Sequence, residues 1–135
     1  MKKACCLLAA LALAPGWAAA ADYPAQTMTL VVPFSAGGGA DNAARIIAQG
    51  MTKAWGQSVI VDNKAGASGS IGATYVARAK PDGYTVLYDA SSFAINPTLR
   101  KLPYDAAKDF IAVSLAISVP NILVELPAIA PDTVG

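Results

Sequence analysis

The chain has 135 residues, of which 55% are hydrophobic and 14% are charged, and its formal net charge is +1. A disordered segment or a protein that coats nucleic acid would carry far more charge, so this composition excludes both and favours one compact domain with a core. The sequence contains no basic stripe suited to a nucleic acid or an anionic lipid surface.

The first 21 residues have the pattern of a secretory signal peptide. Two lysines near the start are followed by a short apolar run over residues 4–14 and by four alanines over residues 18–21. The apolar run is too short to cross a bilayer, which needs about 20 apolar residues, so a membrane anchor is the less favoured alternative. We expect cleavage near Ala20 or Ala21 and export of the mature chain.

Removal of this segment changes the chemistry of what remains. Both cysteines, Cys5 and Cys6, leave with it, so the mature chain would form no disulfide. Without the two lysines, eight basic residues face nine acidic ones, a net charge of −1. Local geometry rather than a general positive field must therefore hold any anionic ligand.

The mature chain begins with a strand, a glycine loop and a helix. Residues 27–34 form a nearly continuous apolar run, which is typical of a strand buried on both faces of a parallel sheet. The loop over 35–41 contains three consecutive glycines. We predict a helix over 42–55, with Asp41 as its N-cap, Gly56 just beyond its end, and a core-facing stripe of Ala44, Ile47, Ala48, Met51 and Trp55.

The same order of elements then repeats. We predict a second strand over 58–62, a second glycine loop over 63–72, and a helix whose core-facing stripe is Ile71, Tyr75, Val76 and Ala79. A turn at 81–83 leads to a third strand over 84–88. Strands that alternate with helices imply right-handed crossovers and an open, mostly parallel sheet, so the predicted fold class is α/β.

The last part of the chain is less regular. Pro97 is well placed as the first residue of a short helix. Two more apolar segments follow over 109–118 and 121–126, and residues 133–135 end the chain where another helix would be expected to start. The sequence therefore looks like part of a longer protein.

Both glycine loops lie where open α/β sheets bind ligands, beyond the carboxyl ends of strands and before helix N-termini. Glycine lets backbone N–H groups approach a ligand, and a helix N-terminus adds partial positive charge, so each loop suits a carboxylate or a phosphate. One such loop alone is more often a simple turn, but two in consecutive units of an exported protein favour a ligand site. Neither loop has the spacing of a P-loop or a dinucleotide fingerprint, and we expect no cofactor.

Catalytic interpretations are weaker. The sequence has no histidine, and the mature chain would have no cysteine, so we expect neither a metal centre nor an enzyme. Residues 66–70 nearly match a nucleophile elbow around Ser68, but no histidine is present to activate it. Asp41, Asp62 and Asp89 each have a capping or strand-end role. A small hydrolytic or nucleotide-binding enzyme fragment is kept as the alternative.

Several motifs resemble one receptor family, in the same order along the chain. They are the segment 23–41 with its three glycines, the segment 59–69, and the short motifs 81–85, 94–97, 102–105, 109–110 and 113–114. These motifs are similar to those of Bug-type receptors, the extracytoplasmic solute-binding proteins of tripartite tricarboxylate transporters. The likeness covers essentially all of the mature chain.

The resemblance implies a two-lobed fold, like that of periplasmic binding proteins, which closes on a small organic anion such as a di- or tricarboxylate. It also implies a periplasmic location, membrane permease subunits as partners, and a monomer; a receptor that signals to a membrane sensor is the alternative. Residues 1–21 would be the signal peptide, 22–110 an incomplete first lobe, and 111–135 a truncated crossover toward the second lobe.

The resemblance also implies the site. In that family, one ligand carboxylate is held between two loops of the first lobe, largely through backbone groups and bridging waters. Carried over to this sequence, the first loop comprises Phe34, Ser35, Ala36, Gly37, Gly38, Gly39, Ala40 and Asp41. The second loop comprises Ala67, Ser68, Gly69 and Ile71, and the weaker candidates at the cleft edge are Ser91, Ser92 and Asn96.

Family members extend well beyond the end of this chain, and we expect the isolated 135 residues to bind a carboxylate weakly or not at all. Micromolar binding needs about 8 kcal/mol. Four hydrogen bonds to a charged group, at roughly 1.5–3 kcal/mol each, leave little once immobilisation and desolvation are subtracted. Calorimetric titration of the isolated chain with citrate or succinate tests this expectation, and a micromolar dissociation constant would contradict it.

Overall fold

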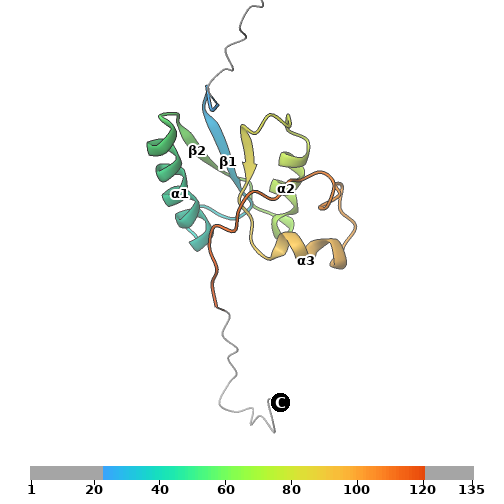
Figure 1. Ribbon diagram of the computed structural model, residues 1–135. Coiled ribbons are helices and arrows are strands. Elements are labelled where there is room, and N and C mark those ends of the chain that lie inside the picture. Colours follow the sequence, from blue (N-terminus) through green and yellow to red (C-terminus); the bar gives the residue numbers. More distant parts are fainter. Residues whose placement is uncertain (1–22, 121–135) are drawn as a thin grey trace, which may run out of the picture.

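The computed structural model describes residues 23–120. The predicted signal peptide and the apolar segment 121–126 lie outside these residues. Figure 1 shows a small parallel sheet flanked by helices. In chain order the elements are β1 (Met28–Val32), α1 (Gly39–Trp55), β2 (Val59–Asn63), the 3-10 turn η1 (Ala67–Gly69), α2 (Ser70–Ala77), β3 (Thr85–Leu87) and α3 (Ser92–Leu99).

The sheet has the order β2-β1-β3, and both strand pairs are parallel. In the register, Met28 of β1 lies opposite Val59 of β2, and Thr29 lies opposite Thr85 of β3. The predicted α/β class with a mostly parallel sheet is therefore confirmed. β1 ends before Pro33, which has no N–H to donate to a neighbouring strand, so the strand is shorter than the apolar run.

The two faces of β1 are covered by different helices. Leu30 and Val32 point to one face and form a buried cluster with Ala44 and Ala48 of α1. Pro33 belongs to the opposite face, where α2 passes directly over it at Gly72. Figure 1 shows α1 and α2 on the two sides of the sheet, as right-handed crossovers in opposite directions require.

The predicted core stripe of the second helix is wrong at two of its four residues. Ile71 and Tyr75 are 51% and 48% exposed, whereas the buried residues of α2 are Gly72 and Ala73. A Cβ atom on Gly72 would lie 2.8 Å from the Cβ atom of Pro33, so only glycine allows this close approach. The small residues therefore face the sheet, and the large apolar side chains point away from it.

Two predicted helix starts are also wrong. α1 begins at Gly39 with Gly38 as its N-cap, so Asp41 is the third helical residue rather than the cap. Pro97 lies inside α3 rather than at its first position, because that helix already begins at Ser92. The predicted end of α1 is confirmed: Gly56 has a φ of 68° and donates its N–H to the carbonyl of Thr52 at 3.0 Å.

Beyond α3 the described chain is irregular, with a turn at residues 105–109. Residues 101–120 contain no helix or strand, and Ile111, Val113 and Leu115 are largely exposed. Within residues 23–120, no helix combines the length and the apolar character that a bilayer crossing requires.

The close contact at Gly72 gives a stability test with a matched control. Gly72→Ala should lower the free energy of unfolding by about 1–3 kcal/mol, because the new methyl group would clash with Pro33 and force the helix outward. Gly50→Ala lies within α1 and meets nothing within 4 Å, so it should raise the free energy of unfolding by about 1 kcal/mol. Urea unfolding of the full-length gene product measures both, and equal effects would show that α2 does not pack on Pro33.

Candidate functional site

The loops that follow the three strands meet at one edge of the sheet. β1 is central, and the chain passes from β1 to β2 on one side and then from β2 to β3 on the other, so the strand order reverses at β1. At this edge, the position of a Cβ atom on Gly69 would be 3.6 Å from Pro33 Cβ and 3.4 Å from Asp89 Oδ2. Such a reversal point is where open α/β sheets bind ligands.

The first loop is held by the Asp41 carboxylate, which is buried at 2% exposure. Its Oδ2 atom accepts hydrogen bonds from the N–H of Gly37 at 2.8 Å and from Nε of Arg45 at 2.9 Å. Its Oδ1 atom accepts one from Nδ2 of Asn63 at 2.9 Å. Nδ2 of Asn63 also donates to the carbonyl of Phe34 at 3.2 Å, so the network joins the loop to α1 and β2.

This network fixes both the shape and the charge of the first loop. The hydrogen bonds, that from Arg45 first, lower the pKa of Asp41 from 3.8 to about 2, so the group is ionised at neutral pH. The carboxylate occupies the first turn of α1 and offsets the positive end of that helix. Residues 35–39 of the loop remain exposed above the network.

The second loop has an unusual backbone. Gly66, Ala67, Ser68 and Gly69 all have positive φ, including 47° at Ala67 and 54° at Ser68, which side-chain-bearing residues rarely adopt. Nδ2 of the buried Asn96 donates to the Ser68 carbonyl at 2.8 Å. Arg100 donates to the Ala67 carbonyl at 3.2 Å and to Oγ of Ser68 at 3.3 Å. Residues from α3 and its C-terminal end thus hold the strained turn in place.

The turn ends at the N-terminus of α2, which differs from that of α1. Gly69 is the N-cap, no side chain caps the helix, and its first turn contains no acidic residue. The first-turn N–H groups and their partial positive charge are therefore not offset by a side chain of the helix itself. Of the two helix starts at this edge, α2 is the better place for an anion.

The third loop, after β3, contains Asp89, for which the sequence predicted only a capping or strand-end role. Its Oδ1 atom accepts hydrogen bonds from the N–H of Ala90 at 2.7 Å and from Oγ of Ser92 at 2.9 Å. Its Oδ2 atom is buried and has no hydrogen-bond partner. Burial raises the pKa of Asp89, and the two hydrogen bonds only partly offset this rise.

The candidate residues from the sequence thus divide by position. Those of both loops gather at one edge of the sheet, while Asn96 lies 3% exposed beneath the second loop and Ser92 hydrogen-bonds to Asp89. Sequence reasoning missed Arg45, Asn63 and Arg100. Arg45 is four residues after Asp41, a spacing that brings two side chains together on a helix. Their ion pair could therefore have been predicted from the sequence.

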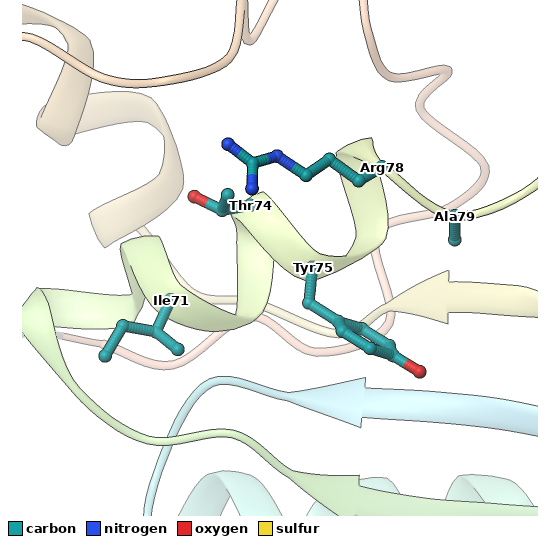
Figure 2. A pocket seen from close by; sticks show the side chains of 5 residues that line it. All are labelled: Ile71, Thr74, Tyr75, Arg78 and Ala79. Carbon is teal, nitrogen blue, oxygen red and sulfur yellow. The ribbon is translucent and has the colours of Figure 1, made fainter.

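A shallow hollow lies apart from this edge. Figure 2 shows the side chains that line it, which come from α2 and the residues just after it. The hollow has a volume of about 390 Å³ and a lining of Ile71, Thr74, Tyr75, Arg78 and Ala79. Ile71 is its one residue among the predicted site residues. Within residues 23–120, no group of three acidic, cysteine or histidine side chains is arranged to hold a metal ion.

A protein-family model described as the tripartite tricarboxylate transporter family receptor matches residues 43–134, most of the chain. The chain belongs to this receptor family. The resemblance of the sequence motifs is therefore confirmed, and the family that the chain belongs to is one of receptors.

Curated relatives agree with this assignment. A protein of Bordetella bronchiseptica is 45% identical over 112 residues, which are 82% of this chain and 33% of that protein. Protein BugT of Bordetella pertussis is 39% identical over 114 residues, which are 82% of this chain and 35% of that protein. The receptor chain thus spans about a third of the length of the curated relatives it matches.

Solved structures show the same fold. A periplasmic transporter is 45% identical with a TM-score of 0.58, over 64% of this chain and 30% of that one. MatC from Rhodopseudomonas palustris with bound malate is 40% identical with a TM-score of 0.58, over 65% and 31%. A protein from R. palustris with adipate is 42% identical with a TM-score of 0.61, over 64% and 29%. The fold of this receptor is therefore part of a periplasmic-binding-protein fold.

The Asp41 network predicts an acid-sensitive stability. Because folding lowers the pKa of Asp41, its contribution to stability is complete above pH 4 and is lost as the pH falls toward about 2. Asp41→Asn should lower the urea midpoint of the full-length receptor at pH 7. As the pH falls toward about 2, the urea midpoints of the variant and the unmodified protein should become more similar.

Asp62→Asn is the matched control, since Asp62 makes an ion pair with Lys64 near the surface at 3.0 Å. It should leave the acid profile nearly unchanged. An identical pH dependence in the Asp41→Asn variant and the unmodified protein would contradict the role given to this network.

Proposed function

We propose that the protein containing this chain is a periplasmic receptor that binds a small organic carboxylate and delivers it to a tripartite tricarboxylate-type transporter. The observation that carries the proposal is the N-terminus of α2. No side chain of α2 caps or neutralises it, and it lies where the strand order reverses. Malate and adipate are bound by two solved proteins of the same fold, which supports a carboxylate as the ligand class.

Recognition would rest on backbone groups. Residues 35–39 of the first loop are exposed, as are Ala67 and Ser68 of the second, so peptide N–H groups of both loops lie near the protein surface at this edge of the sheet. Gly37 already donates its N–H to Asp41 and would shape the loop rather than contact the ligand. We propose the loop residues 34–41, 67–69 and 71, with Ser91, Ser92 and Asn96 at the edge, as the ligand-binding set.

The organisation of the whole protein is proposed on the same grounds. Residues 1–21 would direct export and be removed near Ala20 or Ala21. Residues 22–110 would form part of the first lobe, and residues 111–135 would lead to a second lobe. Closure of the two lobes on the ligand would create the surface that the membrane permease subunits recognise, and the receptor would act as a monomer.

Catalysis is not part of this proposal. Oγ of Ser68 accepts a hydrogen bond from Nη2 of Arg100 at 3.3 Å. A guanidinium group stays protonated at physiological pH and cannot remove the hydroxyl proton, so it does not activate a nucleophile. The chain also contains no histidine to serve as the base. The near match to a nucleophile elbow is therefore better explained by the glycines of a tight turn.

Thermal unfolding of the full-length gene product with malate, adipate, succinate and citrate tests the proposal. At least one acid should raise the melting temperature, since a ligand at 100 times its dissociation constant stabilises the folded state by about 2.7 kcal/mol. Ser68→Ala should keep this stabilisation, and neither form should consume the acid. The absence of any shift, or turnover that Ser68→Ala abolishes, would contradict a receptor function.

A further inference from the structure

Asp89 is an acidic residue at the centre of the candidate site that the proposed function does not use. It lies two residues after the end of β3, and its Oδ2 atom is buried without a hydrogen-bond partner. Both carboxylate oxygens lie within 3.5 Å of the Cβ position at Gly69, which is the N-cap of α2. The carboxylate therefore lies against the helix start to which the ligand carboxylate is assigned.

The groups that face Asp89 do not neutralise it. Its Oδ1 atom is held by Ala90 and Ser92, which are both uncharged donors. The ion pairs within residues 23–120 involve other acidic residues, namely Asp41, Asp62 and Asp105. The titratable neighbour is Tyr104, whose pKa is raised by burial and then by the charge of Asp89, and whose hydroxyl is likewise buried without a partner.

Two negative charges at one helix N-terminus repel each other, and they share a single source of partial positive charge. The conflict disappears when one of the two carboxyl groups is protonated. Asp89 is the group predisposed to accept the proton, because it is already desolvated and lacks a cationic partner, whereas the ligand carboxylate would be solvated until it binds.

We propose that Asp89 is a specificity-determining residue of the receptor, which opposes a ligand carboxylate at the N-terminus of α2 unless Asp89 takes up a proton from water as the ligand binds. This inference rests on the proposed function. It distinguishes classes of ligand: an ionised carboxylate binds at this point with uptake of a proton, whereas a neutral hydrogen-bond acceptor, such as an amide, binds there without one.

The burial of Asp89 favours the uptake of a proton by its carboxylate when a ligand carboxylate binds. Burial raises the pKa of Asp89 above its usual range even without a ligand, and a second negative charge nearby raises that pKa further. Ligand affinity should therefore be greatest at low pH within the range where the acid itself stays ionised, and it should fall as the pH rises from the pKa that Asp89 has in the free receptor to the higher pKa that it has in the complex.

The experiment is calorimetric titration of the full-length gene product with malate, adipate, succinate and citrate from pH 6 to pH 8, in two buffers of different ionisation enthalpy. The unmodified protein should take up a proton on binding, and its affinity should fall as the pH rises. Asp89→Asn keeps an oxygen for Ala90 and Ser92 but removes the charge. It should bind at pH 8 about tenfold more tightly, the effect of one pKa unit, with no proton uptake.

Asp82→Asn is the matched control, because it removes the same charge at the opposite edge of the sheet, where Asp82 accepts a hydrogen bond from the N–H of Tyr84 at 3.1 Å. It should bind like the unmodified protein. Equal affinity and equal pH dependence in Asp89→Asn and the unmodified protein would overturn the role of Asp89 and leave the receptor function intact. Failure of every acid to bind any of the three proteins would instead overturn the proposed function.

A second measurement guards against a folding defect. Asp89→Asn removes a partly buried charge without an ionic partner, so its melting temperature without ligand should equal or exceed that of the unmodified protein. If the variant does not fold, proton uptake by the unmodified protein decides the question. Binding of an ionised acid without proton uptake anywhere between pH 6 and pH 8 would overturn the inference.

Discussion

Both oxygens of the Asp41 carboxylate are occupied by donors from three parts of the chain: the first loop, α1 and the end of β2. Asn63 extends this network by donating to the carbonyl of Phe34, so the path of the loop is defined at both of its ends. A glycine-rich loop has a large conformational entropy, and this buried charge confines it to one shape. The position of this loop at the carboxyl end of the sheet depends on that confinement.

The two helix starts at this edge differ in charge for a structural reason. α1 carries its own carboxylate in the first turn, so its positive end is compensated within the fold. α2 has none and begins directly after a turn whose carbonyl groups are held by Asn96 and Arg100. These donors bind the carbonyl groups of Ala67 and Ser68, while the N–H groups of Gly69 and Ser70 donate within the turn, to the carbonyls of Gly66 and Ala67. The start of α1 is therefore compensated by its own carboxylate, whereas the first turn of α2 contains no acidic residue.

The sequence predicted the strands, the parallel α/β sheet and the place where the loops meet, because hydrophobic periodicity and glycine clusters are local signals. It did not predict which face of α2 is buried, since glycine at position 72 becomes the contact residue only when Pro33 lies against it. Asp41 was assigned to the cap because acidic residues are common there, but Gly38 already has the extended backbone of a cap. The contact between Asn63 and Asp41 joins residues 22 positions apart and leaves no periodic signal.

Gly72 has an effect that reaches beyond packing. Because it lets α2 lie directly against Pro33 at the end of β1, it keeps the first-turn N–H groups of the helix close to the carboxyl end of the sheet. The packing distance between helix and sheet therefore sets how far those donors stand from a bound anion. Electrostatic attraction weakens with distance. Under the proposed function, the absence of a side chain at position 72 would therefore set how strongly α2 attracts the ligand carboxylate.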